Sequence, residues 1–172
     1  MFKSADAALK WAFRVMATEI VKLSSINRMS GSGGSADLSP HDKHAQAALI
    51  MQILERELNQ LEIAYVMANY RGIGRLEHES EVVTMLSKAV IAAFPTGMHS
   101  MRGASKLVRI YFGQDIGISS IRRDFKCGND KSNEYRDIAF KQLGGIGGRA
   151  DAVIEDALIR SGIVEPQIAK FA

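Results

Sequence analysis

The sequence predicts an all-α protein, a helical bundle with a helix-turn-helix toward its C-terminal end. Apolar residues recur three and four positions apart through most of the chain, which is the spacing of one helix face. No segment alternates apolar and polar residues long enough to require a sheet, and no internal repeat is visible. The apolar pattern gives about seven helices.

Composition limits the class of protein. The 172 residues suffice for one sizeable core, and 47% hydrophobic with 24% charged residues is typical of a soluble globular protein. No apolar run approaches the ~20 residues of a membrane helix, and the N-terminus lacks the apolar region of a signal peptide. We therefore expect a cytoplasmic protein that does not bind membranes.

The chain divides into five predicted segments, and a Ser- and Gly-rich stretch is their clearest boundary. This stretch lacks the pattern of a phosphate-binding loop, so it is interpreted as a linker. The segments are an N-terminal helix (1–24), a flexible linker (25–38), a helical core (39–97), a helix-turn-helix region with a closing helix (98–162) and a tail (163–172).

Two capping patterns locate the first helices. Ser4 is expected to cap a helix over residues 4–23. A second, long helix is expected to begin where Ser39 caps, Pro40 takes the first helical position and Asp42 closes an acidic capping box. Trp11 is predicted to pack in the core. Two sides of the long helix are expected to be covered, because one stripe has Ala45, Ala48, Leu49, Gln52, Ile53 and Arg56, and Ile50, Met51, Leu54 and Leu58 widen it.

Asn59 and Glu62 form a further cap, which predicts a break or kink after the long helix. The apolar run that follows, residues 61–70, is short enough for a strand, but its flanking residues favour a helix. A polar turn with glycines leads to a helix over residues 79–94, which Pro95 ends.

The next stretch, residues 98–143, predicts a helix, a short helix, a turn and a last helix. Gly113 ends the first of these, and the short one closes near Phe125. The last helix is expected from about residue 130 to 143, with Asp130 or Ser132 as its N-cap. The "GGIGG" run at 144–148 is expected to end this helix and to form a hinge before a closing helix.

Positive charge is concentrated in one part of the chain. Residues 98–149 hold ten basic and five acidic side chains, whereas residues 41–97 and 150–172 each carry a net negative charge. A basic surface of this kind fits a polyanionic partner, although solvated basic faces are also common.

No motif indicates an enzyme. The carboxylates fall mainly on helix surfaces near basic residues, and no nucleophile, P-loop or metal-ligand cluster is evident. The lone Cys127 excludes an intramolecular disulfide, and His41 and His44 are interpreted as surface residues. The sequence therefore predicts a non-enzymatic protein without metal or cofactor.

Two segments carry a family resemblance, "LEIAYVMANYRG" at residues 61–72 and "SSIRRDFKCGNDKSNEYRDIAFKQL" at 119–143. Together they resemble phage-encoded transcription regulators with a sigma-region-4-like helix-turn-helix, including late-gene antitermination proteins of the Q type. The resemblance covers about residues 38–161. Arg123 and Asp124 replace the apolar and small residues that the family places there, and the Cys-rich zinc motif of one branch is absent. The resemblance implies binding to a promoter-proximal DNA element and contact with RNA polymerase.

The sequence thus predicts a sequence-specific transcription regulator that binds double-stranded DNA. The alternative interpretation is a non-enzymatic interaction or packaging adaptor that oligomerises through residues 39–94. For DNA binding, residues at or near base edges are expected to be Lys131, Ser132, Asn133 and Arg136. Phosphate contacts are expected from Arg102, Lys106, Arg109, Arg122, Arg123, Lys126 and Lys141.

Overall fold

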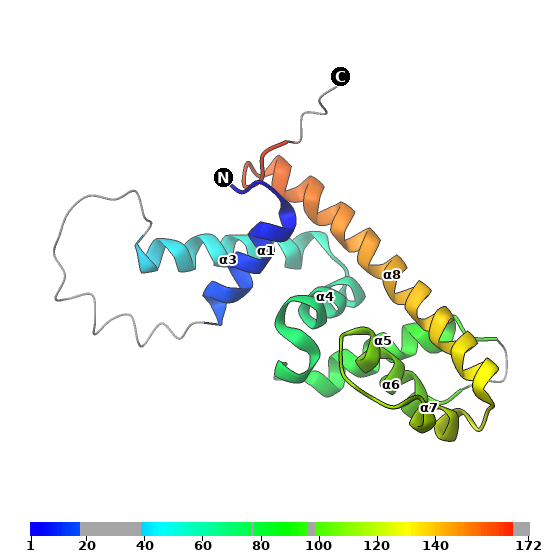
Figure 1. Ribbon diagram of the computed structural model, residues 1–172. Helices are drawn as coiled ribbons and strands as arrows, with labels where there is room; N and C mark the ends of the chain where they lie inside the picture. The colour runs from blue at the N-terminus through cyan, green and yellow to red at the C-terminus, as the bar shows by residue number, and fades with distance from the viewer. Residues whose placement is uncertain (18–38, 77, 96–98, 167–172) are drawn as a thin grey trace, which may run out of the picture. The chain divides into compact units, whose positions relative to one another are not determined.

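A computed structural model describes residues 1–17, 39–76, 78–95 and 99–166 (Figure 1). Over these residues the fold is all-α, as predicted, and one isolated bridge between Phe2 and Val164 is the single β-type pairing. The α-helices are α1 (Ala5–Met16), α3 (Pro40–Glu57), α4 (Gln60–Met67), α5 (Glu79–Ala92), α6 (Met101–Tyr111), α7 (Ile118–Phe125) and α8 (Asn129–Arg160). In the described part of the chain, no helix is long and apolar enough to cross a membrane.

The chain forms two compact units. Unit 1 comprises Met1–Glu57 and Val153–Ala172, and unit 2 comprises Leu58–Ala152. Unit 2 therefore takes residues from both the predicted core (39–97) and the predicted helix-turn-helix region (98–162). The predicted linker at 25–38 lies outside the described residues.

Local capping starts the helices of unit 1, as the sequence predicts. The Ser4 hydroxyl accepts a hydrogen bond from the Ala7 amide at 3.2 Å. At α3, the Ser39 hydroxyl accepts from the Asp42 amide at 3.2 Å and donates to the Asp42 carboxylate at 2.6 Å. These bonds satisfy amide groups that an isolated helix start leaves unpaired.

Tertiary packing in unit 1 differs from the expectation at two places. Trp11 is half-buried and packs against Phe2, with the two rings tilted by 53° and their centroids 5.3 Å apart. The predicted apolar surface of α3 is wrong in part. Ile50, Ile53 and Leu54 are buried as expected, whereas Ala45, Ala48 and Leu49 are exposed, Leu49 at 49%. Ala47 is buried as well.

Unit 2 begins at the predicted cap. The Asn59 side chain accepts from the Glu62 amide at 3.0 Å, and the Glu62 carboxylate accepts from the Asn59 amide at 3.1 Å. This capping box ends α3 and starts α4, so the run after Asn59 is a helix and not a strand. A π-helical turn, η1 (Ala68–Gly72), and a 3-10 turn, η2 (Ile73–Arg75), follow, and Gly72 takes a φ of 78° between them.

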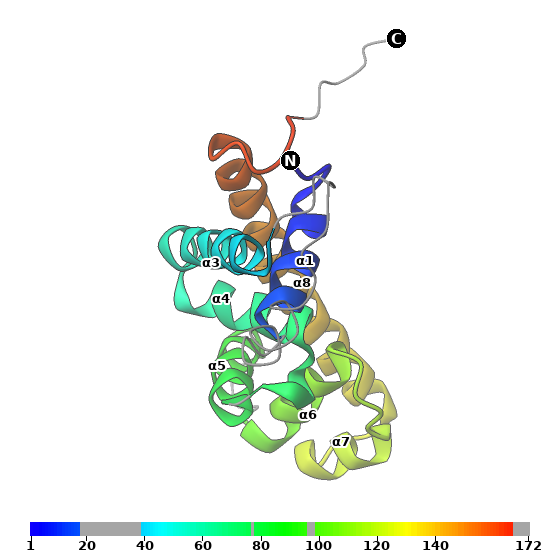
Figure 2. The ribbon, with the colours of Figure 1, turned by 90° about the vertical axis from the view of Figure 1, so that its left-hand side faces the viewer.

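The core of unit 2 lies among α4, α5, α6, α7 and the first part of α8, and both ribbon views show α5, α6 and α7 gathered there (Figures 1 and 2). Its largest fully buried side chains include Leu86, Leu107, Ile121, Tyr135 and Leu143. Gly113, with a φ of 87°, follows α6 as predicted.

The predicted break at 144–148 is wrong, because α8 is one continuous helix of 32 residues. The four glycines disfavour a helix by roughly 1 kcal/mol each relative to alanine. The packing of unit 2 overrides this cost, since Leu143, Ile146 and Ala150 are fully buried on one side of α8. Gly147 lies against Tyr65 of α4, where a Cβ would come within 2.7 Å of the Tyr65 Cε1 atom.

Candidate nucleic-acid interface

A tight turn joins α7 to α8. Lys126 adopts the left-handed conformation, with φ 50° and ψ 45°, and the Cys127 amide donates to the Arg122 carbonyl at 3.1 Å. Cys127 and Gly128 complete the connection, and α8 begins at Asn129. A three-residue turn between two helices is the length that helix-turn-helix motifs use.

Three aromatic rings hold these helices together. Phe94, Phe125 and Tyr135 are buried, and their ring centroids lie 5.0 to 5.6 Å apart. Gly103 of α6 allows this packing, because a Cβ there would lie 2.6 Å from the Phe125 Cζ atom. The turn and the start of α8 therefore pack on a buried aromatic cluster.

Three of the predicted phosphate contacts are paired with carboxylates. Lys106 Nζ lies 2.5 Å from Asp124 Oδ2, and Arg102 Nε lies 3.6 Å from Asp124 Oδ1. Arg109 forms an ion pair with Glu79 of α5. Lys106 and Arg109 are also partly buried, whereas the Arg102 side chain is 82% exposed.

Four other predicted cations are exposed and make no ion pair within the described residues: Arg123, Lys126, Lys131 and Lys141. We call Arg123, Lys126 and Lys131 the basic corner, because they lie on α7, the turn and the first turn of α8. Arg122, beside them, is half-buried and donates to the Asn129 side-chain oxygen at 2.6 Å.

The four predicted base-edge residues differ in exposure. Lys131 and Asn133 are exposed, and Arg136 is half-buried with its Nε atom 3.5 Å from Asp137 Oδ1. Ser132 is fully buried, so the prediction that it faces solvent is wrong. Its hydroxyl donates to the Asn129 carbonyl at 2.7 Å. Because α8 already begins at Asn129, the prediction of Asp130 or Ser132 as its N-cap is wrong.

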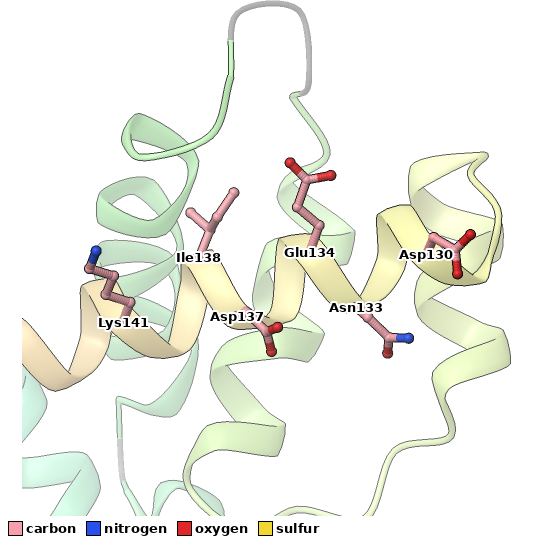
Figure 3. A pocket seen from close by; sticks show the side chains of 6 residues that line it. All are labelled: Asp130, Asn133, Glu134, Asp137, Ile138 and Lys141. Carbon is pink, nitrogen blue, oxygen red and sulfur yellow. The ribbon is translucent and has the colours of Figure 1, made fainter.

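Sequence reasoning missed the acidic side chains on the outer face of α8. Asp130, Glu134 and Asp137 are exposed there, at spacings of four and three residues. They line an open hollow of about 580 Å³ together with Asn133, Ile138 and Lys141. Glu134, Ile138 and Lys141 project to one side of the helix, and Asn133 and Asp137 to the other (Figure 3).

The helical spacing alone could have revealed this face, because Asp130, Glu134 and Asp137 lie opposite the buried Tyr135 and Ala139. The face offers four side chains with acceptor oxygens and one cation, the exposed Lys141, which is a predicted phosphate contact.

A second hollow of about 320 Å³ in unit 2 lies between α4 and α5, and its lining is mainly apolar, with Ile63, Met67, Val82 and Met85. Within the described ranges, no group of three or more His, Cys, Asp or Glu side chains could hold a metal ion. Comparison with known proteins identified no matching protein family, no matching curated protein and no matching solved structure.

Proposed function

We propose that the chain is a sequence-specific DNA-binding transcription regulator, and that it contacts double-stranded DNA with α7, the turn and the start of α8. The basic corner carries this proposal. Arg123, Lys126 and Lys131 are free to meet phosphates, because no carboxylate among the described residues pairs with them. Cations on both sides of a short interhelical turn fit the backbone-contacting role in DNA recognition.

The outer face of α8 is suited to contact base edges rather than phosphates. Carboxylates repel phosphates, so Asp130, Glu134 and Asp137 oppose a purely electrostatic attachment of this face. Carboxylate and amide oxygens do accept hydrogen bonds from cytosine and adenine amino groups in the major groove. We therefore assign phosphate contacts to the basic corner and base contacts to the outer face of α8.

A salt titration of DNA binding tests the proposal. Fluorescence anisotropy would give the Kd of a labelled duplex at several salt concentrations for the parent chain and for the triple variant Arg123→Ala, Lys126→Ala and Lys131→Ala. The slope of log Kd against log salt should fall by about 0.9 for each phosphate contact that is lost.

The matched control removes three cations elsewhere in unit 2: Arg71→Ala, Arg75→Ala and Lys88→Ala. It changes the net charge equally and should leave the salt slope nearly unchanged. Equal slopes for the corner variant and the parent, at ~0.1 M salt and above, would contradict the proposal.

The narrower assignment is a phage or prophage late-gene regulator or antiterminator that acts with RNA polymerase. The resemblance of residues 61–72 and 119–143 supports it. An antitermination assay with purified RNA polymerase on a terminator template tests the antiterminator assignment separately. DNA binding without increased read-through of the terminator would contradict that assignment but not the proposal of a DNA-binding regulator.

An oligomerising adaptor is the second candidate, and one observation favours it. Leu49 is 49% exposed on α3, and Ala45 and Ala48 beside it are exposed as well. Light scattering on the parent and on Leu49→Glu separates the two functions. An adaptor should lose its oligomeric mass in the variant and show no salt-dependent binding to DNA.

A further inference from the structure

The Asp124 carboxylate is buried beside the proposed DNA-contacting surface, and the proposed DNA-binding function does not assign it a role. It lies on α7, its side chain is only 8% exposed, and it pairs with two cations of α6. Lys106 Nζ is 2.5 Å from Asp124 Oδ2 and also donates to the Ser120 hydroxyl. Arg102 Nε is 3.6 Å from Asp124 Oδ1.

The contact between Lys106 and Asp124 is an ion pair rather than an aligned hydrogen bond. Asp124 Oδ2 has no aligned hydrogen bond among the described residues, although the Lys106 ammonium lies beside it. A carboxylate taken out of water needs an opposite charge nearby. Lys106 meets this need, and its own side chain is 21% exposed as a result.

The pairing divides the cations of this region into two classes. Arg123, Lys126 and Lys131 are exposed and unpaired, whereas Lys106 is held inward and neutralised. Because α6 and α7 contribute one partner each, the same ion pair also fixes α7 against α6.

We propose that Asp124 is a positioning residue that limits the positive charge presented to DNA by holding Lys106 away from phosphates. This inference rests on the proposed function. The ion pair of Asp124 with Lys106 lowers the part of the affinity that comes from phosphate contacts alone. The base contacts then contribute a larger share of binding, so discrimination between DNA sequences increases.

Three variants test the proposal through the salt dependence of binding to a duplex of arbitrary sequence. Asp124→Asn should release Lys106 and steepen the slope of log Kd against log salt by about 0.9, the value for one added phosphate contact. A fourfold rise in salt then weakens the variant about 3.5-fold more than the parent. The double variant Asp124→Asn with Lys106→Gln should return to the parent slope. Asp115→Asn, which removes an exposed carboxylate between α6 and α7, is the matched control and should keep the parent slope.

A measurement on the parent protein does not depend on how the variants fold. Brief acetylation followed by mass spectrometry reports the reactivity of each lysine amine. Lys106 should react much more slowly than Lys126, and DNA should protect Lys126 while leaving the rate of Lys106 nearly unchanged.

The outcomes separate the two ideas. A parent without salt-dependent DNA binding overturns the proposed function, and this inference with it. If the parent binds DNA, the inference alone is overturned by a folded Asp124→Asn variant with the parent slope, by a double variant that keeps the steeper slope, or by equal acetylation rates for Lys106 and Lys126.

Discussion

The Tyr65 ring lies directly against Gly147 of α8, where any side chain would collide with it: a Cβ at Gly147 would come within 2.7 Å of Tyr65 Cε1. Gly148, the next residue, has nothing within 4 Å of its Cβ position. The two neighbouring glycines of one helix therefore have opposite structural roles.

Gly147→Ala should destabilise the protein by roughly 1–3 kcal/mol, because Tyr65 or the backbone of α8 must move to admit the methyl group. Gly148→Ala should stabilise it by up to about 1 kcal/mol, since alanine is the better helix former and the position is open. Urea unfolding followed by circular dichroism measures both. Similar changes for the two variants would mean that Tyr65 does not pack on Gly147.

Tyr65 should make stability depend on pH in the alkaline range. Burial, followed by its 3.1 Å hydrogen bond to the Tyr111 hydroxyl, raises the pKa of Tyr65. The unfolded chain ionises this phenol near its ordinary pKa of about 10. The folded chain keeps the proton to higher pH, so the free energy of unfolding is unaffected below pH ~10 and falls above it, by at most about 1.4 kcal/mol per pH unit.

Urea titrations of the parent and Tyr65→Phe between pH 8 and about 11 check this, and the variant should lose less stability as the pH rises. Tyr70→Phe removes a phenol from a half-buried position and serves as the comparison. A parent and a Tyr65→Phe variant with parallel pH profiles would contradict the prediction.

Ser132→Ala should leave the base preference of DNA binding unchanged. The Ser132 side chain is fully buried and its hydroxyl donates to the Asn129 carbonyl, so it cannot reach a base edge. The loss of that hydrogen bond should cost about 1 kcal/mol of stability. Selection of bound duplexes from a random pool measures the base preference. A changed consensus sequence for this variant would mean that Ser132 is exposed and contacts DNA.

Glu134→Gln should change the preferred base at one position of the selected sites. A carboxylate accepts from the cytosine amino group, whereas a glutamine side chain pairs with both adenine N6 and N7. The discrimination at that position should shift by ~1–3 kcal/mol. Glu155→Gln, an exposed carboxylate in the part of α8 that belongs to unit 1, is the control. An unchanged consensus with uniformly tighter binding would show that Glu134 acts only through its charge.

The parts of the fold that depend on local interactions were predictable. Ser4, Ser39 and Asn59 each bond to a group three residues away, so their capping roles follow from the sequence alone. The helical spacing likewise predicts the buried Ala104, Leu107 and Val108 of α6.

Contacts between distant residues could not be predicted in this way. The close packing at Gly147 of α8 involves Tyr65, some 80 residues earlier in the chain, and the neutralisation of Lys106 depends on Asp124 in another helix. Ser132 was predictable in principle, because it lies three residues before Tyr135 on the same helix face. Its polar side chain suggested exposure, and the internal hydrogen bond to Asn129 removes the cost of burial.

The bridge at the start of the chain sets an order of events during synthesis. The Phe2 amide donates to the Ile163 carbonyl at 2.8 Å, and the Glu165 amide donates to the Phe2 carbonyl at 3.0 Å. Unit 2 is one uninterrupted segment, Leu58–Ala152, so its folding needs no residue from 153 onward. Phe2 is synthesised long before residues 163–165 and cannot make these hydrogen bonds until they follow, so we expect Phe2 and its neighbours to be late in reaching their final state.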